Sequence, residues 1–144
     1  MVSTVGLLSG ISIAGVGNAT ILVTGTVLIF VEAISMGAGS FLSESSAEIY
    51  ENHRDGLTER SYLDALIMFA SYLVSGFIPL IPYIVLPQNT AFWTSIDLSL
   101  FVLFLLGIFG ARMSNTSMWR SVARMMLVGG GAIAVGSVIG RLLR

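Results

Sequence analysis

The sequence predicts an all-α integral membrane protein, with five transmembrane helices in a single membrane domain over residues 1–144. Hydrophobic residues make up 55% of the chain and charged residues only 10%, whereas an ordinary soluble domain carries about 25% charged residues. The mean hydropathy is +0.90. The apolar residues also gather in five runs between short polar turns, which is the pattern of a chain that crosses a bilayer several times.

The first two runs differ in length. Residues 2–16 would rise only about 22 Å as a helix, whereas a bilayer core is about 30 Å thick and needs about 20 residues. This first span is therefore expected to be short. After a turn signal at Gly17–Asn18, residues 19–42 are long enough to cross, and residues 43–61 form an acidic extension and loop in which the helix first continues beyond the membrane.

The last three runs cover residues 62–86, 92–111 and 118–143. Pro79 and Pro82 lie inside the first of them, and proline removes a backbone donor and kinks a helix. A bent or broken segment is expected there, since membranes tolerate such breaks where neighbours satisfy the freed carbonyls. The last run carries adjacent glycines, which favour close helix contact; no strand precedes them and no Lys follows, so they do not indicate a phosphate-binding loop.

One acidic residue lies well inside the second run. An ionisable side chain at membrane depth costs a few kcal/mol or more, so Glu32 indicates a functional site. Met36 follows four residues later, which places both side chains on one face of a helix. Gly37 and Gly39 would let another helix approach closely. The alternative is a protonated, hydrogen-bonded Glu32 that only locks helices together.

Acidic residues continue past the second span. Glu44, Glu48, Glu51 and Asp55 recur at helical spacing and share one face. This stripe would concentrate cations at the mouth of a path. The alternative is an ordinary solvated helix face.

The arginines predict the orientation. The connection between the second and third spans carries Arg54 and Arg60, and the turn between the fourth and fifth spans is flanked by Arg112, Arg120 and Arg124. The other two connections carry no arginine. By the positive-inside rule, the N-terminus and the acidic extension are cytoplasmic, and the C-terminus with Arg141 lies outside.

Composition excludes several functions. There is no Cys, which removes disulfides, thiolate zinc sites and Cys nucleophiles together. All seven basic residues are Arg, so the chain has neither a nucleotide-binding Walker lysine nor a Schiff-base lysine. The net charge of −1 gives no indication of nucleic acid as a partner. With one His, His53, and no nucleophile–base pair, we expect no enzyme and no permanently bound cofactor.

Three separated segments resemble signatures of the vacuolar iron transporter family. They are V-E-A-I-S-M-G-A-G-S-F-L at 31–42, S-G-F-I-P-L-I-P-Y at 75–83, and the glycine-rich stretch at 120–140. Residues 2–10 also resemble the first helix of that family. The resemblance covers nearly the whole chain in the right order. It implies export of Fe²⁺ or Mn²⁺ from the cytoplasm by proton exchange, through a homodimer whose first two helices line the path.

The resemblance carries over residue by residue. Glu32 and Met36 match the acidic and thioether positions of the second helix of the family. Glu44 and Glu48 match the acidic start of its cytoplasmic extension. Together with Glu51, which continues the stripe, these five residues are the candidate metal ligands.

There are two departures from the family pattern. The first helix of the family carries an Asp-Gly pair just before the stretch that begins here at Val2, and that metal-pathway Asp is absent. Either the chain start is truncated or misplaced, or transport itself is in doubt. Larger members insert a helical, Glu- and Met-rich metal-binding domain between spans two and three, where only about twenty residues stand here. The chain would thus be a short, prokaryotic-type member that lacks most of that domain.

The expected localisation is the cell membrane if the source is prokaryotic and a vacuolar-type membrane if it is eukaryotic. The expected partners are the lipid bilayer, a second copy of the chain, divalent metal ions and protons. The alternative function is a non-transporting membrane scaffold or assembly subunit of the same fold, which the missing Asp and the glycine-rich contact faces would suit.

Overall fold

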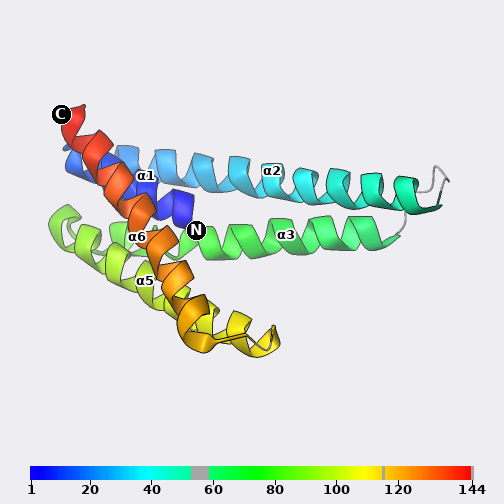
Figure 1. Cartoon of the computed structure of the whole chain (residues 1–144). Coiled ribbons are helices and arrows are strands. Elements are labelled where there is room, and N and C mark those ends of the chain that lie inside the picture. The colour runs from blue at the N-terminus through cyan, green and yellow to red at the C-terminus, as the bar shows by residue number, and fades with distance from the viewer. Residues whose placement is uncertain (53–58, 115, 144) are drawn as a thin grey trace. The chain divides into compact units, whose positions relative to one another are not determined.

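The computed structural model describes residues 1–52, 59–114 and 116–143, without the side chains of residues 51, 52, 59 and 60. The described residues contain helices and turns but no strand, which confirms the all-α prediction (Figure 1). In chain order the helices are α1 (Val2–Ile13), α2 (Asn18–Asn52), α3 (Glu59–Phe77), α4 (Ile81–Val85), α5 (Gln88–Met113) and α6 (Met118–Leu142).

The chain divides into two compact units. Unit 1 consists of Met1–Thr26 and Phe77–Arg144, and unit 2 consists of Val27–Gly76. Unit 1 therefore holds α1, α4, α5 and α6 with the start of α2, whereas unit 2 holds the rest of α2 paired with α3. The two units are described separately below.

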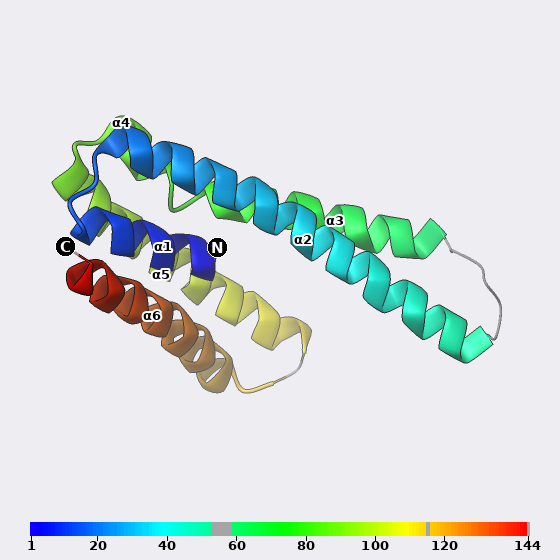
Figure 2. The same ribbon diagram turned by 90° about the horizontal axis from the view of Figure 1, so that it is seen from above.

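A seam of small residues joins α1 to α6 in unit 1, where the two helices lie side by side (Figure 2). A Cβ added to Gly6 would lie 2.9 Å from the carbonyl oxygen of Ala132, and one added to Gly10 would lie 2.8 Å from that of Gly136. The reverse positions are tighter still, because Cβ atoms on Gly136 and Gly140 would strike the carbonyls of α1. Small residues that let two backbones touch are the usual basis of helix packing in membranes.

The other contacts of unit 1 centre on α5. Its buried face repeats every four residues from Ala91 to Ala111, as expected for one side of a helix. Gly107 lies against Val122 of α6, where an added Cβ would come within 2.9 Å of the Val122 Cα. The buried Ser95 hydroxyl donates to the Pro79 carbonyl oxygen at 2.6 Å, whereas the next serine of that face, Ser99, donates to a carbonyl of its own helix.

The predicted break in the third run lies between α3 and α4. Helix α3 ends at Phe77, and α4 begins at Ile81 with Pro82 in its first turn. Pro79 has no amide proton, and its carbonyl is satisfied from another helix by Ser95. The bend therefore follows the rule that broken membrane helices need outside partners for their freed backbone groups.

Unit 2 is an antiparallel hairpin of α2 and α3 (Figure 2). Gly76 faces Ile29 near one end, and the rings of Phe41 and Tyr62 lie 5.0 Å apart toward the other. Helix α2 continues past Leu42 to Asn52, so the acidic extension is helical at first, as the spacing predicts. The rest of the predicted loop, residues 53–58, lies outside the described residues.

Within the described residues, three helices are long and apolar enough to cross a membrane: Asn18–Tyr50, Gln88–Met113 and Met118–Leu142. Two shorter apolar helices accompany them, Val2–Ile13 and Ser61–Phe77. The integral membrane character of the chain rests on the three long helices. The count of five spans stays a prediction, since α1 has 12 residues and would rise only about 18 Å.

Candidate functional site

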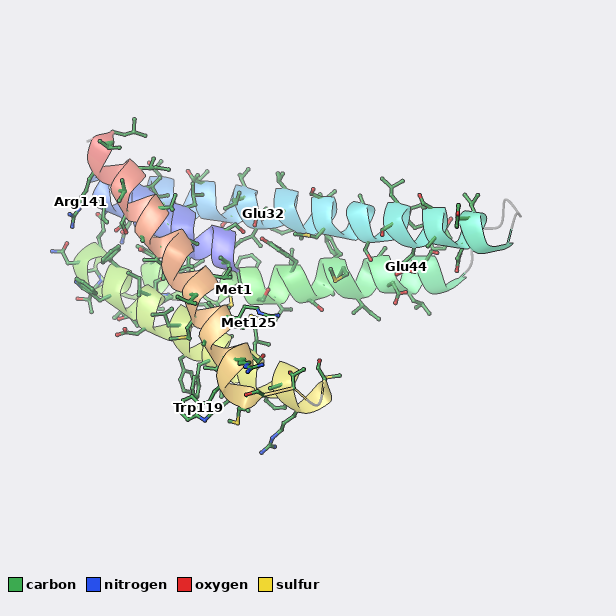
Figure 3. All side chains as sticks on the ribbon, in the orientation of Figure 1. Met1, Glu32, Glu44, Trp119, Met125 and Arg141 are labelled. Atoms are coloured by element: carbon green, nitrogen blue, oxygen red, sulfur yellow. The ribbon has the colours of Figure 1, made fainter. Side chains whose placement is uncertain are left out.

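Glu32 lies on α2 in unit 2 and is half-buried against α3. The hydroxyl of Tyr72, on α3, donates a hydrogen bond to the Oε2 atom of Glu32. Figure 3 labels Glu32 in the middle part of α2. A carboxylate that accepts a charge-assisted bond of this kind is held in one orientation. A carboxylate has about four lone-pair sites, so one such group can accept a hydrogen bond and contact a cation as well.

Met36 lies one helical turn beyond Glu32 in α2, on the same side of the helix, and is 46% exposed. The two side chains therefore share the face that the sequence predicts, but they differ in environment. Glu32 is turned toward α3, whereas the thioether of Met36 lies on a more open surface. The pair offers a hard oxygen and a soft sulfur within one turn.

The neighbouring glycines have different roles in unit 2. Gly37 is buried, and a Cβ there would come within 3.2 Å of the Ala65 carbonyl oxygen and of the Phe69 Cβ. The small side of Gly37 is thus used by α3 of the same chain. Gly39 has nothing within 4 Å of an added Cβ. Of the two glycines, only Gly39 leaves a face of α2 open for a second helix.

The acidic stripe has mixed surroundings. Glu48 is half-buried, and its Oε2 atom accepts a hydrogen bond from the Ser61 hydroxyl at 3.1 Å. Glu44, labelled in Figure 3, is exposed. Glu51 belongs to α2, but its side chain lies outside the described residues, and Asp55 lies outside them altogether. Among the described residues, no group of three or more His, Asp or Glu side chains forms a metal-binding cluster.

Asp97 is a second acid inside a long apolar helix. The predicted fourth span begins at residue 92 and would place Asp97 near one end of it. Helix α5 begins four residues earlier, at Gln88, so Asp97 is its tenth residue of 26, about 14 Å from the start. Asp97 is therefore also an acid in the middle part of a long apolar helix, and position in a helix does not by itself single out Glu32.

Sequence reasoning missed Tyr72 and Ser61, which are the hydrogen-bond donors to two of the predicted metal ligands. Tyr72 is a polar aromatic residue inside an apolar run, and buried tyrosine hydroxyls usually find a partner. That partner could not be read from spacing, because it depends on how α2 and α3 align. The exposed Tyr62 of the same helix instead packs its ring against Phe41 in a tilted arrangement.

A comparison with protein-family models matches the chain to the VIT family, with residues 1–64 in one match and residues 51–141 in another. The first match contains Glu32, Met36 and the acidic stripe, and the second contains Tyr72. The two matches together span all six helices except the last residue of α6. No match was found among curated proteins.

Proposed function

This chain belongs to the vacuolar iron transporter family, VIT, a family of metal-ion transporters, and we propose that it exports Fe²⁺ or Mn²⁺ from the cytoplasm in exchange for protons. The observation that supports this most directly is the hydrogen-bonded pair of Glu32 and Tyr72 inside an apolar helix hairpin. Intramembrane carboxylates are costly and mark ion or proton paths. The family is one of transporters, so the scaffold alternative is not favoured.

Glu32 and Met36 would contact the transported ion. Fe²⁺ and Mn²⁺ accept carboxylate ligands, and the softer thioether would favour Fe²⁺ over Mg²⁺. One carboxylate and one sulfur make a weak site in a single chain. A homodimer would double the set around a two-fold axis, which is the commonest symmetry of oligomers. The open face of α2 at Gly39 is compatible with such a partner.

Proton exchange would use the same carboxylate. A metal ligand must be deprotonated, so binding of the ion releases a proton from Glu32, and departure of the ion lets a proton return. Tyr72 would act as a positioning residue, because its hydroxyl keeps the Glu32 carboxylate oriented while the ion enters and leaves. Substitution of Tyr72 therefore tests the proposal without removing the Glu32 carboxylate itself.

The acidic extension would raise the cation concentration at the cytoplasmic mouth. Glu44 is exposed and suits long-range attraction, whereas Glu48 is held by Ser61. Glu51 would extend the same charged face. The contribution of this stripe should shrink as ionic strength rises, because exposed charges are screened by salt.

Proteoliposomes loaded with a pH-sensitive dye would test the proposal. Glu32→Gln keeps size and polarity but cannot ionise, so it should abolish both metal uptake and metal-driven proton movement. Met36→Leu should weaken Fe²⁺ transport more than Mn²⁺ transport. Tyr72→Phe should slow transport at every metal concentration, by about tenfold if one charge-assisted bond is lost, while the matched control Tyr62→Phe should leave the rate unchanged.

Thermal unfolding of each variant in detergent separates lost function from lost fold. Transport by Glu32→Gln at the wild-type rate would show that the carboxylate is structural. The same variants should also be made in a chain that carries Asp-Gly before Val2, the pair found in the first helix of the family. If the parent chain without this pair is inactive, the variants can then still be compared with an active parent.

A further inference from the structure

A recess of about 1030 Å³ lies at one end of unit 1, where the end of α1, the start of α5 and the end of α6 meet. We call it the Arg141 recess. Its polar lining comes from three helices, and the side chains that contribute it are Ser12, Gln88, Asn89, Ser137 and Arg141. The recess is remote in sequence from Glu32 and Met36, and neither of them lines it.

The charge of the recess has one sign. Among the described residues, Arg141 is the only charged one in the lining, and no carboxylate from that part of the chain lines it. Within the described part of the chain, Arg141 has no recorded ion-pair partner. Its guanidinium carries five N–H donors in a fork that suits a phosphate or carboxylate. A cation in the last turn of a helix also complements the helix dipole, but that effect does not account for the polar residues of α5 that line the same recess.

The start of α5 also carries backbone donors, and its first two residues line the recess. The amides of Thr90 and Ala91 bond to the Pro87 carbonyl, which leaves the two earlier amides of α5 without an acceptor inside the helix. The Gln88 side chain donates to the Val16 carbonyl oxygen at 2.7 Å and so ties the start of α5 to the turn after α1. Gly15 in that turn has a φ of +79°, a conformation that favours glycine. The start of α5 is therefore fixed against the turn after α1.

The remainder of the lining is apolar and continues along the helices. Ile13, Phe92, Ile96 and Ile133 supply it, and Trp93 beside them is 66% exposed. Exposed tryptophans of membrane proteins gather at the headgroup level of the bilayer. An occupant with an anionic head and an apolar tail would match both kinds of lining. Figure 3 labels Arg141 near the end of α6.

We propose that the Arg141 recess binds a phosphate group, held by the Arg141 guanidinium and the first amides of α5. Two sources carry this chemistry, the headgroup of an anionic phospholipid and free inorganic phosphate. The apolar side chains in the lining of the recess favour the lipid as the source. The site is separate from the proposed metal path, since Glu32, Met36 and Tyr72 do not line the recess.

Native mass spectrometry of the full chain in detergent would test the site. Phosphatidylglycerol should form adducts with the wild type, and Arg141→Gln should weaken that binding by about tenfold or more, the effect of losing one charged hydrogen bond. Arg124→Gln is the matched control, because it removes the same charge from the same helix outside the recess. Equal melting temperatures without lipid would show that both variants fold.

Inorganic phosphate distinguishes the two sources. If millimolar phosphate does not displace phosphatidylglycerol, the occupant is a lipid headgroup. If phosphate displaces the lipid from the wild type, and does so only while Arg141 is present, the phosphate chemistry holds and the free ion is the occupant. Adduct levels that are the same in Arg141→Gln and Arg124→Gln would overturn the proposal.

Discussion

The seam between α1 and α6 allows a quantitative prediction for Gly136→Ala. At the facing position, Gly10, an added Cβ would lie 2.8 Å from a backbone oxygen, about 0.6 Å inside ordinary contact, and Gly136 is tighter. The obstacle is the Gly6 carbonyl, which cannot rotate away as a side-chain end could. Overpacking of this kind costs about 1–3 kcal/mol. We therefore expect Gly136→Ala to lower the free energy of unfolding by that amount, despite the better helix propensity of Ala.

Gly130→Ala is the matched control on the same helix. Nothing lies within 4 Å of a Cβ added at Gly130, so only helix propensity acts there, and the change should stabilise by about 0.5–1 kcal/mol. Both variants would be unfolded in mixed micelles of mild detergent and dodecyl sulfate, followed by circular dichroism. The reasoning would be refuted if the two substitutions shifted the transition in the same direction by the same amount.

Three further predictions concern assembly, topology and the bend. Gly39→Cys should crosslink between chains on oxidation, because the position is open and the chain has no native Cys; a strictly monomeric protein in mild detergent would contradict the dimer. Cysteines at Ser46 and Asn89 should be labelled from opposite sides of the membrane, and labelling of both from one side would contradict the topology. Ser95→Ala should destabilise by about 1–3 kcal/mol in thermal unfolding, because it leaves the buried Pro79 carbonyl without its donor. Ser99→Ala is the control, since the Ser99 hydroxyl bonds within its own helix. An equal loss of stability in Ser99→Ala would count against the explanation.

Hydropathy and the backbone chemistry of proline were enough to predict most of the fold. The broken segment at Pro79 and Pro82 follows from missing amide protons, and the continuation of α2 beyond Leu42 follows from acidic residues at helical spacing. Helix partners were harder to predict. Gly37 was expected to let another helix approach closely, and the structure shows that this helix is α3 of the same hairpin. A glycine indicates close approach but does not say of which helix.

The site was predictable only where it depends on one helix. Glu32 and Met36 are four residues apart in α2, and that spacing fixes their shared face without any tertiary information. Tyr72 lies 40 residues from Glu32, and its contact requires the register of the α2–α3 hairpin. That register is set by packing such as Ile29 against Gly76, which no local pattern encodes.

Asp97 and Glu32 are both acids inside long apolar helices, but their surroundings differ. Asp97 is the tenth residue of 26 in α5 and Glu32 the fifteenth of 35 in α2, so position in the helix alone does not rank the two as candidate metal ligands. Glu32 is half-buried and receives the Tyr72 hydroxyl, whereas Asp97 is exposed in unit 1 and has no recorded donor among the described residues. A residue that repeatedly binds and releases an ion must keep its orientation between events, and a fixed donor provides this. The hydrogen bond from Tyr72, not the position of the acid in the helix, is therefore the observation that supports Glu32 as the proposed metal ligand.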